Sequence, residues 1–265
     1  MDLGLGGAAA VVVGGSRGMG FATARCLAEE GARVAVVGRS QAGVEAAAES
    51  LSGYGSPDAV GFAVDVRDGD AVSELFADLG GRWGGELNVL VNTVGPNAQG
   101  AFDVLTDDQW RDAVDDGVMS MVRCVRSALP LLRSAQWARI VNFSAQSTRR
   151  QSVPLVAYTA AKSMLTSASK NLSQLLAPDE ILVNVVSPGT IVTPSLIEWA
   201  MSVGVESSDP YALMDAIGAH FGHPAQMPRA GLPEEVGPLV AFLASRRNSY
   251  ITGADINIDG GSDFT

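Results

Sequence analysis

Short apolar runs rich in β-branched residues alternate along the chain with longer stretches of helical periodicity. This alternation is typical of βαβ units, in which helices connect the strands of a parallel sheet. The predicted strands are Ala8–Val13, Arg33–Val37, Ala59–Val64, Asn88–Asn92, Ala138–Ser144, Ile181–Ser187 and Asp255–Ile258. The predicted helices are Gly18–Glu30, Gln41–Ser52, Asp68–Leu79, Asp107–Leu132, Val156–Leu176 and Pro233–Ala244. Because the strands are apolar almost throughout, we expect helices to cover both faces of the sheet.

The pattern predicts the α/β fold class, with a doubly wound, Rossmann-like parallel sheet of about seven strands. No repeat, low-complexity tract or linker interrupts the series, so we expect one domain over residues 1–265. The rhythm breaks between residues 190 and 228, in a long connection with helical patches of its own. Connections of this length are usually functional, and we expect a substrate-binding lid there.

Composition limits the partners that the chain can have. The formal charge is −11, and this acidic balance argues against nucleic acid and anionic membrane surfaces, which attract clustered Lys and Arg. Cys26 and Cys124 form no disulfide framework or metal-ligand spacing, and His220 and His223 lack a third ligand of matching spacing. No leader or membrane-spanning segment is evident. We expect a cytoplasmic protein with a small-molecule substrate and no metal, nucleic-acid or membrane partner.

A glycine-rich motif follows the first predicted strand and opens the first predicted helix. Its glycines are Gly14, Gly18 and Gly20, in the spacing Gly-x-x-x-Gly-x-Gly. Backbone amides at a helix N-terminus bind anions, and glycines allow a pyrophosphate to approach that backbone. A tight turn without a ligand is the alternative interpretation. The context favours a dinucleotide site.

The end of the second predicted strand indicates which dinucleotide is bound. An acidic residue there would hydrogen-bond the ribose 2′-hydroxyl of NAD, whereas this chain has Gly38, Arg39 and Ser40. Arg39, together with Arg17 in the glycine loop, could hold a 2′-phosphate through charge-assisted hydrogen bonds. NADP(H) is therefore favoured, with NAD(H) still possible. Alternatively, Arg39 is a solvated residue at a strand end.

Tyr158 and Lys162 carry the candidate chemistry. Residues four apart share one face of a helix, so the amine of Lys162 can lie beside the phenol of Tyr158. A tyrosine pKa of about 10 is too high for efficient proton transfer near neutrality, and an adjacent cation can lower it by about 1–3 units. The pair predicts an acid/base group.

Further motifs occur in a fixed order along the chain. They are Asp65-Val66, Asn92-Thr93-Val94-Gly95, Ile140–Ser144, Ser187–Thr190 with Thr193, Arg229–Val236 and Asp259–Gly261. With the glycine loop and the Tyr158/Lys162 pair, they resemble the short-chain dehydrogenase/reductase family, in its 3-oxoacyl-reductase-like branch, over essentially the whole chain.

The resemblance implies an NADP-dependent ketoreductase that transfers a hydride between the nicotinamide and a carbonyl or alcohol carbon. It implies that Tyr158 is the acid/base and that Lys162 lowers its pKa and holds a ribose. The cofactor contacts that follow from the motifs and the resemblance are Gly14, Ser16, Arg17, Gly18, Met19, Gly20, Arg39, Ser40, Asp65, Val66, Asn92, Gly95, Tyr158, Lys162, Pro188, Gly189, Ile191 and Thr193. A homotetramer, packed through Asp107–Leu132 and Val156–Leu176, is also implied.

The chain departs from the family at its catalytic positions. The family serine lies thirteen residues before the tyrosine, where this chain has Ala145, and the family asparagine of the proton relay is replaced by Gly117. Because side chains alternate along extended backbone, Ser147 is expected to point where residue 145 points and Ser144 to point away. Ser147 is the predicted substitute. Thr93 likewise replaces the second asparagine of the Asn-Asn-Ala-Gly turn.

Three functions remain open from the sequence. The first is reduction or oxidation of an apolar carbonyl or alcohol, since the connection 195–227 carries many large apolar side chains that could line a pocket. Those side chains could equally pack the lid onto the core. The second is a non-catalytic dinucleotide-binding or scaffold protein, because Ala145 and Gly117 replace catalytic residues. The third is an alkene-reducing or non-redox enzyme on the same fold.

Overall fold

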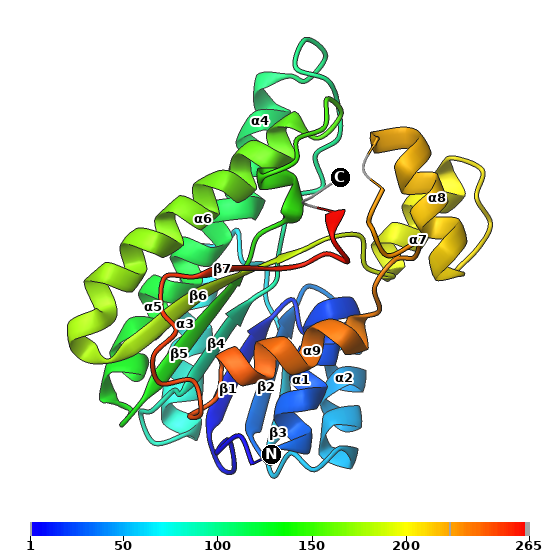
Figure 1. Cartoon of the computed structure of the whole chain (residues 1–265). Helices are drawn as coiled ribbons and strands as arrows, with labels where there is room; N and C mark the ends of the chain where they lie inside the picture. The colour runs from blue at the N-terminus through cyan, green and yellow to red at the C-terminus, as the bar shows by residue number, and fades with distance from the viewer. Residues whose placement is uncertain (1, 223, 263–265) are drawn as a thin grey trace.

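Seven parallel strands form one sheet in the order β3-β2-β1-β4-β5-β6-β7 in the computed structural model, which describes residues 2–222 and 224–262 (Figure 1). The strands are β1 Ala9–Val13, β2 Arg33–Gly38, β3 Ala59–Ala63, β4 Val89–Asn92, β5 Ala138–Phe143, β6 Ile181–Pro188 and β7 Asp255–Ile258. The order reverses between β1 and β4, so the loops that leave their carboxyl ends diverge. Ligands of such sheets bind in the crevice at this switch point.

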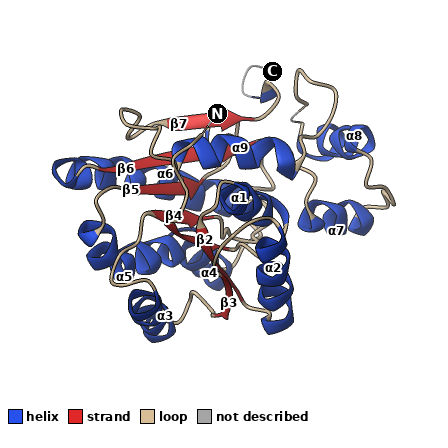
Figure 2. Cartoon of the chain, turned by 90° about the horizontal axis from the view of Figure 1, so that it is seen from below, coloured by secondary structure: helices blue, strands red, loops and turns tan. Residues whose placement is uncertain are grey.

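Helices cover both faces of the sheet, as the continuous apolar strands predict (Figure 2). On one face lie α1 Gly18–Glu29, α2 Gln41–Gly53 and α9 Pro233–Leu243. On the other lie α3 Gly69–Arg82, α4 Asp107–Val114, α5 Ser120–Ser134 and α6 Val156–Leu176. Every residue of β1 is buried, and each face of the sheet has its own hydrophobic core. The predicted α/β fold class is therefore confirmed.

The range Asp107–Leu132 is helical throughout, as predicted, but a π-helical turn, Asp115–Met119, divides it into α4 and α5. Gly117 lies in that turn, and a Cβ placed on it would come 2.8 Å from the Cβ of Ala161 in α6 and 3.2 Å from Cδ of Pro96. Gly117 therefore allows the helix made of α4, the π-turn and α5 to pack closely against α6. The extra residue of the π-turn accommodates the contact.

The connection between residues 190 and 228 contains two helices, α7 Pro194–Ser202 and α8 Pro210–Phe221, which project beside the sheet (Figure 1). They enclose a small core of their own around Ala200, Leu213 and Ala230. His223 lies outside the described residues. None of the helices in the described part of the chain is both long and apolar enough to cross a membrane.

Candidate active site

A cavity of about 870 Å³ opens at the carboxyl edge of the sheet. Its walls come from the glycine loop, from the loops after β2, β4, β5 and β6, from the start of α6, and from α7 and α8. Arg17, Arg39, Ser147 and Tyr158, which lie far apart in sequence, all line it. The fold thus brings the predicted phosphate-binding cations and the predicted acid/base into one space.

The glycine loop has the geometry of an anion cradle. Gly14 and Gly18 have positive φ angles of 81° and 57°, and a Cβ on Gly20 would collide with the carbonyl oxygen of Gly14. Side-chain oxygens cap the N-termini of α2, α3 and α4, whereas no side chain caps α1 and no acidic residue lies in its first turn. The leading amides of α1 therefore remain available for a phosphate, which fits a dinucleotide.

The two predicted phosphate-binding arginines lie in different surroundings. Arg17 forms an ion pair at 3.5 Å with Glu198 of α7, and both side chains are largely exposed. Arg39 is exposed at the carboxyl end of β2, and the neighbouring Ser40 caps α2 by accepting a hydrogen bond from the amide of Gly43. Because no carboxylate follows β2, the end of the strand presents positive charge to a ligand.

About half of the predicted cofactor residues line the cavity. Those that do are Arg17, Met19, Arg39, Gly95, Tyr158, Pro188, Gly189, Ile191 and Thr193. Those that do not are Gly14, Ser16, Gly18, Gly20, Ser40, Asp65, Val66, Asn92 and Lys162. Asn92, of the second group, donates to Oδ1 of Asn142 at 2.8 Å and so links β4 to β5. Thr93, which departs from the family motif, donates its hydroxyl to the carbonyl of Val13 at 2.8 Å and so joins β4 to the glycine loop.

Tyr158 and Lys162 lie in the first two turns of α6, as predicted, but their pKa values differ from the expectation. Burial raises the pKa of Tyr158 to about 12, and burial lowers the pKa of Lys162 to about 8. The Lys162 ammonium donates to the carbonyl of Phe143 at 2.7 Å and to that of Val94 at 3.4 Å. The amine is therefore anchored to the ends of β4 and β5, and the expected lowering of the phenol pKa is not found.

Ser144 points away from the cavity and Ala145 and Ser147 line it, as expected, although Ser147 does so from the 3₁₀ turn Gln146–Thr148, where alternation no longer holds. Ala145 has extended backbone, with φ −159° and ψ 148°, and it lines the cavity together with Ser147. Ser144 instead points to α6, where its hydroxyl bonds to Oγ1 of Thr166 at 2.7 Å. The Ser147 oxygen accepts a hydrogen bond from Oγ1 of Thr159 at 3.1 Å, which leaves its own proton free to donate. That Ser147 acts as the substitute stays a prediction.

Because of the close contact at Gly117, replacing glycine by alanine should have opposite effects on stability at Gly117 and at Gly81. Gly117→Ala places a methyl group against Ala161 and should lower the free energy of unfolding by about 1–3 kcal/mol, as overpacking typically does. Gly81→Ala, in α3 with no atom within 4 Å of the new Cβ, should raise it by about 0.5–1 kcal/mol. Urea denaturation of both variants measures the difference, and equal effects would contradict the packing argument.

Gln146 is one of several residues of the cavity wall, Asn97 and Gln99 among them, that the sequence did not indicate. Gln146 is only 8% exposed, yet it lines the cavity, and its side-chain oxygen has no hydrogen-bond partner among the described residues. It lies between Ala145 and Ser147 in a short 3₁₀ turn, Gln146–Thr148. Its position next to the missing serine was a signal in the sequence, but alternation along extended backbone would turn it away from the cavity.

The apolar side chains of the 190–228 connection divide between the two roles that the sequence left open. Leu196, Trp199, Ile217 and Phe221 line the cavity, and the rings of Trp199 and Phe221 lie 5.1 Å apart between centroids with an interplanar angle of 37°. Leu213 instead is fully buried within the small core between α7 and α8. The connection therefore contributes apolar side chains to the cavity wall, beside the polar Ser195, Glu198 and Ser202, and also packs on itself.

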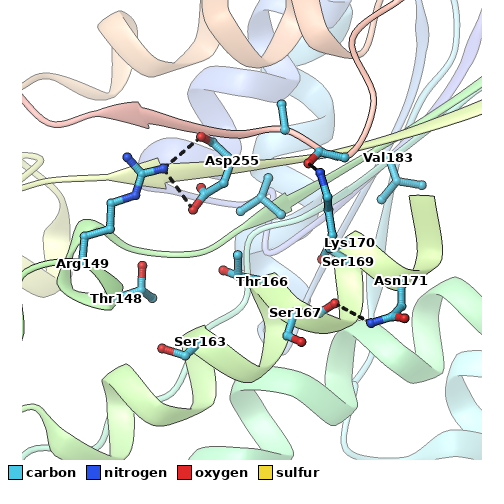
Figure 3. Close-up of a pocket in the computed structure, with 13 residues that line it drawn as sticks. Thr148, Arg149, Ser163, Thr166, Ser167, Ser169, Lys170, Asn171, Val183 and Asp255 are labelled. Atoms are coloured by element: carbon cyan, nitrogen blue, oxygen red, sulfur yellow. Dashed lines mark hydrogen bonds and ion pairs between the residues drawn. The ribbon is translucent and has the colours of Figure 1, made fainter. Parts of the chain in front are cut away.

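A second cavity, of about 620 Å³, lies on the outer side of α6, beside β6 and the loop before β7 (Figure 3). Its two cations are already engaged: Arg149 pairs with Asp255 at 3.5 Å, and Lys170 donates to the carbonyl of Gly253 at 2.7 Å. Ser163 and Ser167 form its floor on α6. This cavity does not contain any of the predicted catalytic or cofactor residues.

The chain matches known oxidoreductases over nearly its whole length. A family model described as enoyl-(acyl carrier protein) reductase matches residues 13–263. The chain is 32% identical over 254 residues to the 3-oxoacyl-(acyl-carrier-protein) reductase FabG of Chlamydia muridarum, covering 96% of each chain. It is 30% identical over 252 residues to the short-chain reductase protein NovJ of Streptomyces niveus, covering 95% of this chain and 92% of the relative.

Solved structures extend the match to the fold. The L-sorbose reductase of Gluconobacter frateurii, complexed with NADPH and L-sorbose, superposes with a TM-score of 0.92 at 28% identity, and all of each chain is covered. A superposition of this quality means that the relative has the same arrangement of strands and helices around its ligands.

Proposed function

The chain belongs to the short-chain dehydrogenase/reductase family, and on this premise we propose that its carboxyl-edge cavity transfers a hydride between NADP(H) and the carbon of a carbonyl or alcohol. The observation that carries the proposal is that Arg39, Ser147 and Tyr158 line one cavity. A phosphate-binding cation, a hydrogen-bond donor and a proton donor are thereby assembled beside an uncapped helix N-terminus.

The residues around the glycine loop fit NADP(H). The leading amides of α1 would hold the pyrophosphate, and Arg39 with Arg17 would hold the 2′-phosphate. Asp65 and Val66 would lie at the adenine end, and Pro188, Gly189, Ile191 and Thr193 at the nicotinamide end. When bound, the nicotinamide supplies or accepts the hydride. Relatives complexed with NADPH support this assignment.

The proton chemistry favours reduction of a carbonyl. A Tyr158 pKa of about 12 keeps the phenol protonated near neutrality, so it is ready to donate a proton to the substrate oxygen. The free hydroxyl proton of Ser147 would hydrogen-bond the same oxygen as negative charge develops on it. Lys162, fixed on the carbonyls of Phe143 and Val94, would hold the ribose. The product alcohol then carries the hydride on carbon and the tyrosine proton on oxygen.

NADP(H) is expected to bind more tightly than NAD(H). Arg39→Ala should weaken NADPH binding by about 10–100-fold, because a charge-assisted hydrogen bond contributes about 1.5–3 kcal/mol, while NADH binding changes little. Fluorescence titration of both cofactors measures the change, with Arg111→Ala on the exposed face of α4 as the matched control. Equal affinity of the parent protein for the two cofactors would contradict the assignment.

A carbonyl panel tests the proposed function as a whole. Consumption of NADPH with saturated ketones or aldehydes is the expected result. Consumption with conjugated alkenes alone would instead indicate alkene reduction, and tight NADPH binding without consumption on any compound would indicate a scaffold protein. Ala145 and Gly117, which replace family catalytic residues, are the reason to include the last outcome.

We also propose that residues 190–228 act as a lid and that the protein is a cytoplasmic homotetramer. The lid assignment rests on the four apolar side chains that α7 and α8 contribute to the cavity wall.

Two surfaces support the homotetramer. α6 exposes Met164 and Leu175, and β7 is an edge strand whose outer side is open to pairing with a second copy. The free thiols of Cys26 and Cys124 suit a reducing compartment. Light scattering should give about four times the chain mass of 27.4 kDa.

A further inference from the structure

Gln146 is the buried residue of the active-site cavity whose hydrogen-bonding capacity the protein leaves unused. The side chain is 8% exposed, its Oε1 is shielded from solvent, and that oxygen has no partner among the described residues. Buried polar groups are almost always paired, because an unpaired one is costly. Because no hydrogen bond from the described residues holds Oε1, the amide is free to turn and to present a polar atom to a molecule bound in the cavity.

The position of Gln146 limits where that partner lies. Its neighbours Ala145 and Ser147 line the same cavity, which also contains Tyr158. The backbone is fixed there by the 3₁₀ turn, in which the Gln146 carbonyl accepts hydrogen bonds from the amides of Arg149 and Arg150 at 2.9 and 3.2 Å. The backbone of Gln146 is thus fixed next to Ser147, whose hydroxyl is proposed to face the reacting oxygen.

We propose that the Gln146 amide determines substrate specificity by binding a hydroxyl group adjacent to the reacting carbonyl, so that the substrates are α-hydroxyketones. This inference rests on the proposed function and names its substrate class. A terminal amide turns easily about its last torsion, so either Oε1 or Nε2 can face the cavity. A hydroxyl suits both orientations, because it can donate to the oxygen and accept from the nitrogen.

The lid contributes a second set of side chains to the cavity. Leu196, Trp199, Ile217 and Phe221 are its apolar members, and Ser195, Glu198 and Ser202 of α7 line the cavity beside them. A substrate with one hydroxyl at the Gln146 wall and an apolar body under the lid complements both surfaces. The expectation of a purely apolar substrate is thereby narrowed to an apolar ketone that carries a vicinal hydroxyl.

The test compares ketones that differ only at the hydroxyl. Acetoin is compared with methyl isopropyl ketone, in which a methyl group replaces the hydroxyl, and benzoin is compared with deoxybenzoin. NADPH consumption should give a kcat/KM about tenfold higher for each hydroxyketone, the effect of one hydrogen bond to an otherwise unpaired group. Gln146→Leu should reduce this ratio to about one, mainly by lowering kcat/KM for the hydroxyketone, while NADPH affinity stays unchanged.

Gln99→Leu is the matched control, because Gln99 lines the same cavity but its side chain is exposed. The hydroxyl preference should persist in this variant. If Gln146→Leu folds poorly, Gln146→Met keeps the chain length and removes the amide. Equal kcat/KM values in the parent protein, or a preference that survives in the Gln146 variants or disappears equally in Gln99→Leu, would overturn the inference.

A binding measurement separates this inference from the proposed function. Calorimetric titration of the Tyr158→Phe protein saturated with NADPH reports the affinity of each ketone without turnover. If no ketone consumes NADPH but the hydroxyketones still bind about tenfold more tightly through Gln146, the proposed function fails and the inference stands. If both members of each pair are reduced and bound equally, the proposed function stands and the inference fails.

Discussion

Tyr158→Phe is expected to lower kcat for ketone reduction by about 10²–10⁴, the contribution of a positioned general acid. The substitution removes one oxygen from a residue of the cavity wall and leaves the glycine loop and Arg39 untouched. The dissociation constant of NADPH should therefore change by less than about twofold. Steady-state kinetics and fluorescence titration of the same protein preparation measure the two quantities.

Tyr250→Phe is the control for this substitution, because Tyr250 is 97% exposed and its phenol lies in solvent. It should have the activity of the parent protein. If Tyr158→Phe retains the parental kcat, another group donates the proton, and the assignment of the acid/base to Tyr158 is wrong.

The pH dependence of the two directions follows from the pKa of Tyr158, which burial raises to about 12. Reduction needs the protonated phenol, so its rate should not fall with rising pH through loss of that proton until the pH approaches this value. Oxidation needs the phenolate, and its rate should rise about tenfold per pH unit as the pH increases toward the pKa of Tyr158. The Tyr158→Phe substitution should remove this rise, and any pH dependence that remains would be due to other groups, such as Lys162, whose pKa burial lowers to about 8.

The fold could be predicted from the sequence because its signals are local and periodic. The bounds of α6, Val156–Leu176, and of β7, Asp255–Ile258, are those of the predicted elements. The π-turn at Gly117 could not be predicted, because its cause is a contact with Ala161 of α6, which lies far along the chain. A mid-helix glycine indicates that something approaches closely but does not identify it.

Features of the candidate site that depend on the local sequence, such as the glycine loop, could be predicted. Properties that depend on the surroundings of a side chain, such as its pKa, could not. The glycine loop and the different directions of Ser144 and Ala145 follow from backbone geometry, whereas Ser147 reaches the cavity from a 3₁₀ turn in which alternation no longer applies. The pKa of Tyr158 does not follow from backbone geometry, because burial raises it, and the Lys162 ammonium donates to the carbonyls of Phe143 and Val94. Gln146 was missed because the chain leaves the extended conformation after Ala145, so alternation ends there.

Ser147→Ala is expected to lower kcat and kcat/KM together by about 10²–10³, the effect of removing one donor to a developing oxyanion. Ser147 is 3% exposed, lines the cavity and accepts a hydrogen bond from Thr159, so its own proton is not used in that bond. Ser144→Ala is the matched control, because the Ser144 hydroxyl bonds to Thr166 on the side of α6. Its effect on kcat should be small. Greater damage from Ser144→Ala would contradict the side-chain directions.

Ala145→Ser places a hydroxyl at the position where the family has its serine, and it tests whether a donor there can reach the substrate oxygen. Ala145 is 6% exposed and lines the cavity on extended backbone, so Ala145→Ser places a hydroxyl there with little strain. In the parent background a second donor should raise kcat modestly, because the oxyanion already has Ser147. In the Ser147→Ala background the same change should recover most of the lost rate, because one donor then replaces the other. Recovery without Ser147 would show that the two positions serve one oxygen, whereas no recovery would place the oxyanion out of reach of residue 145.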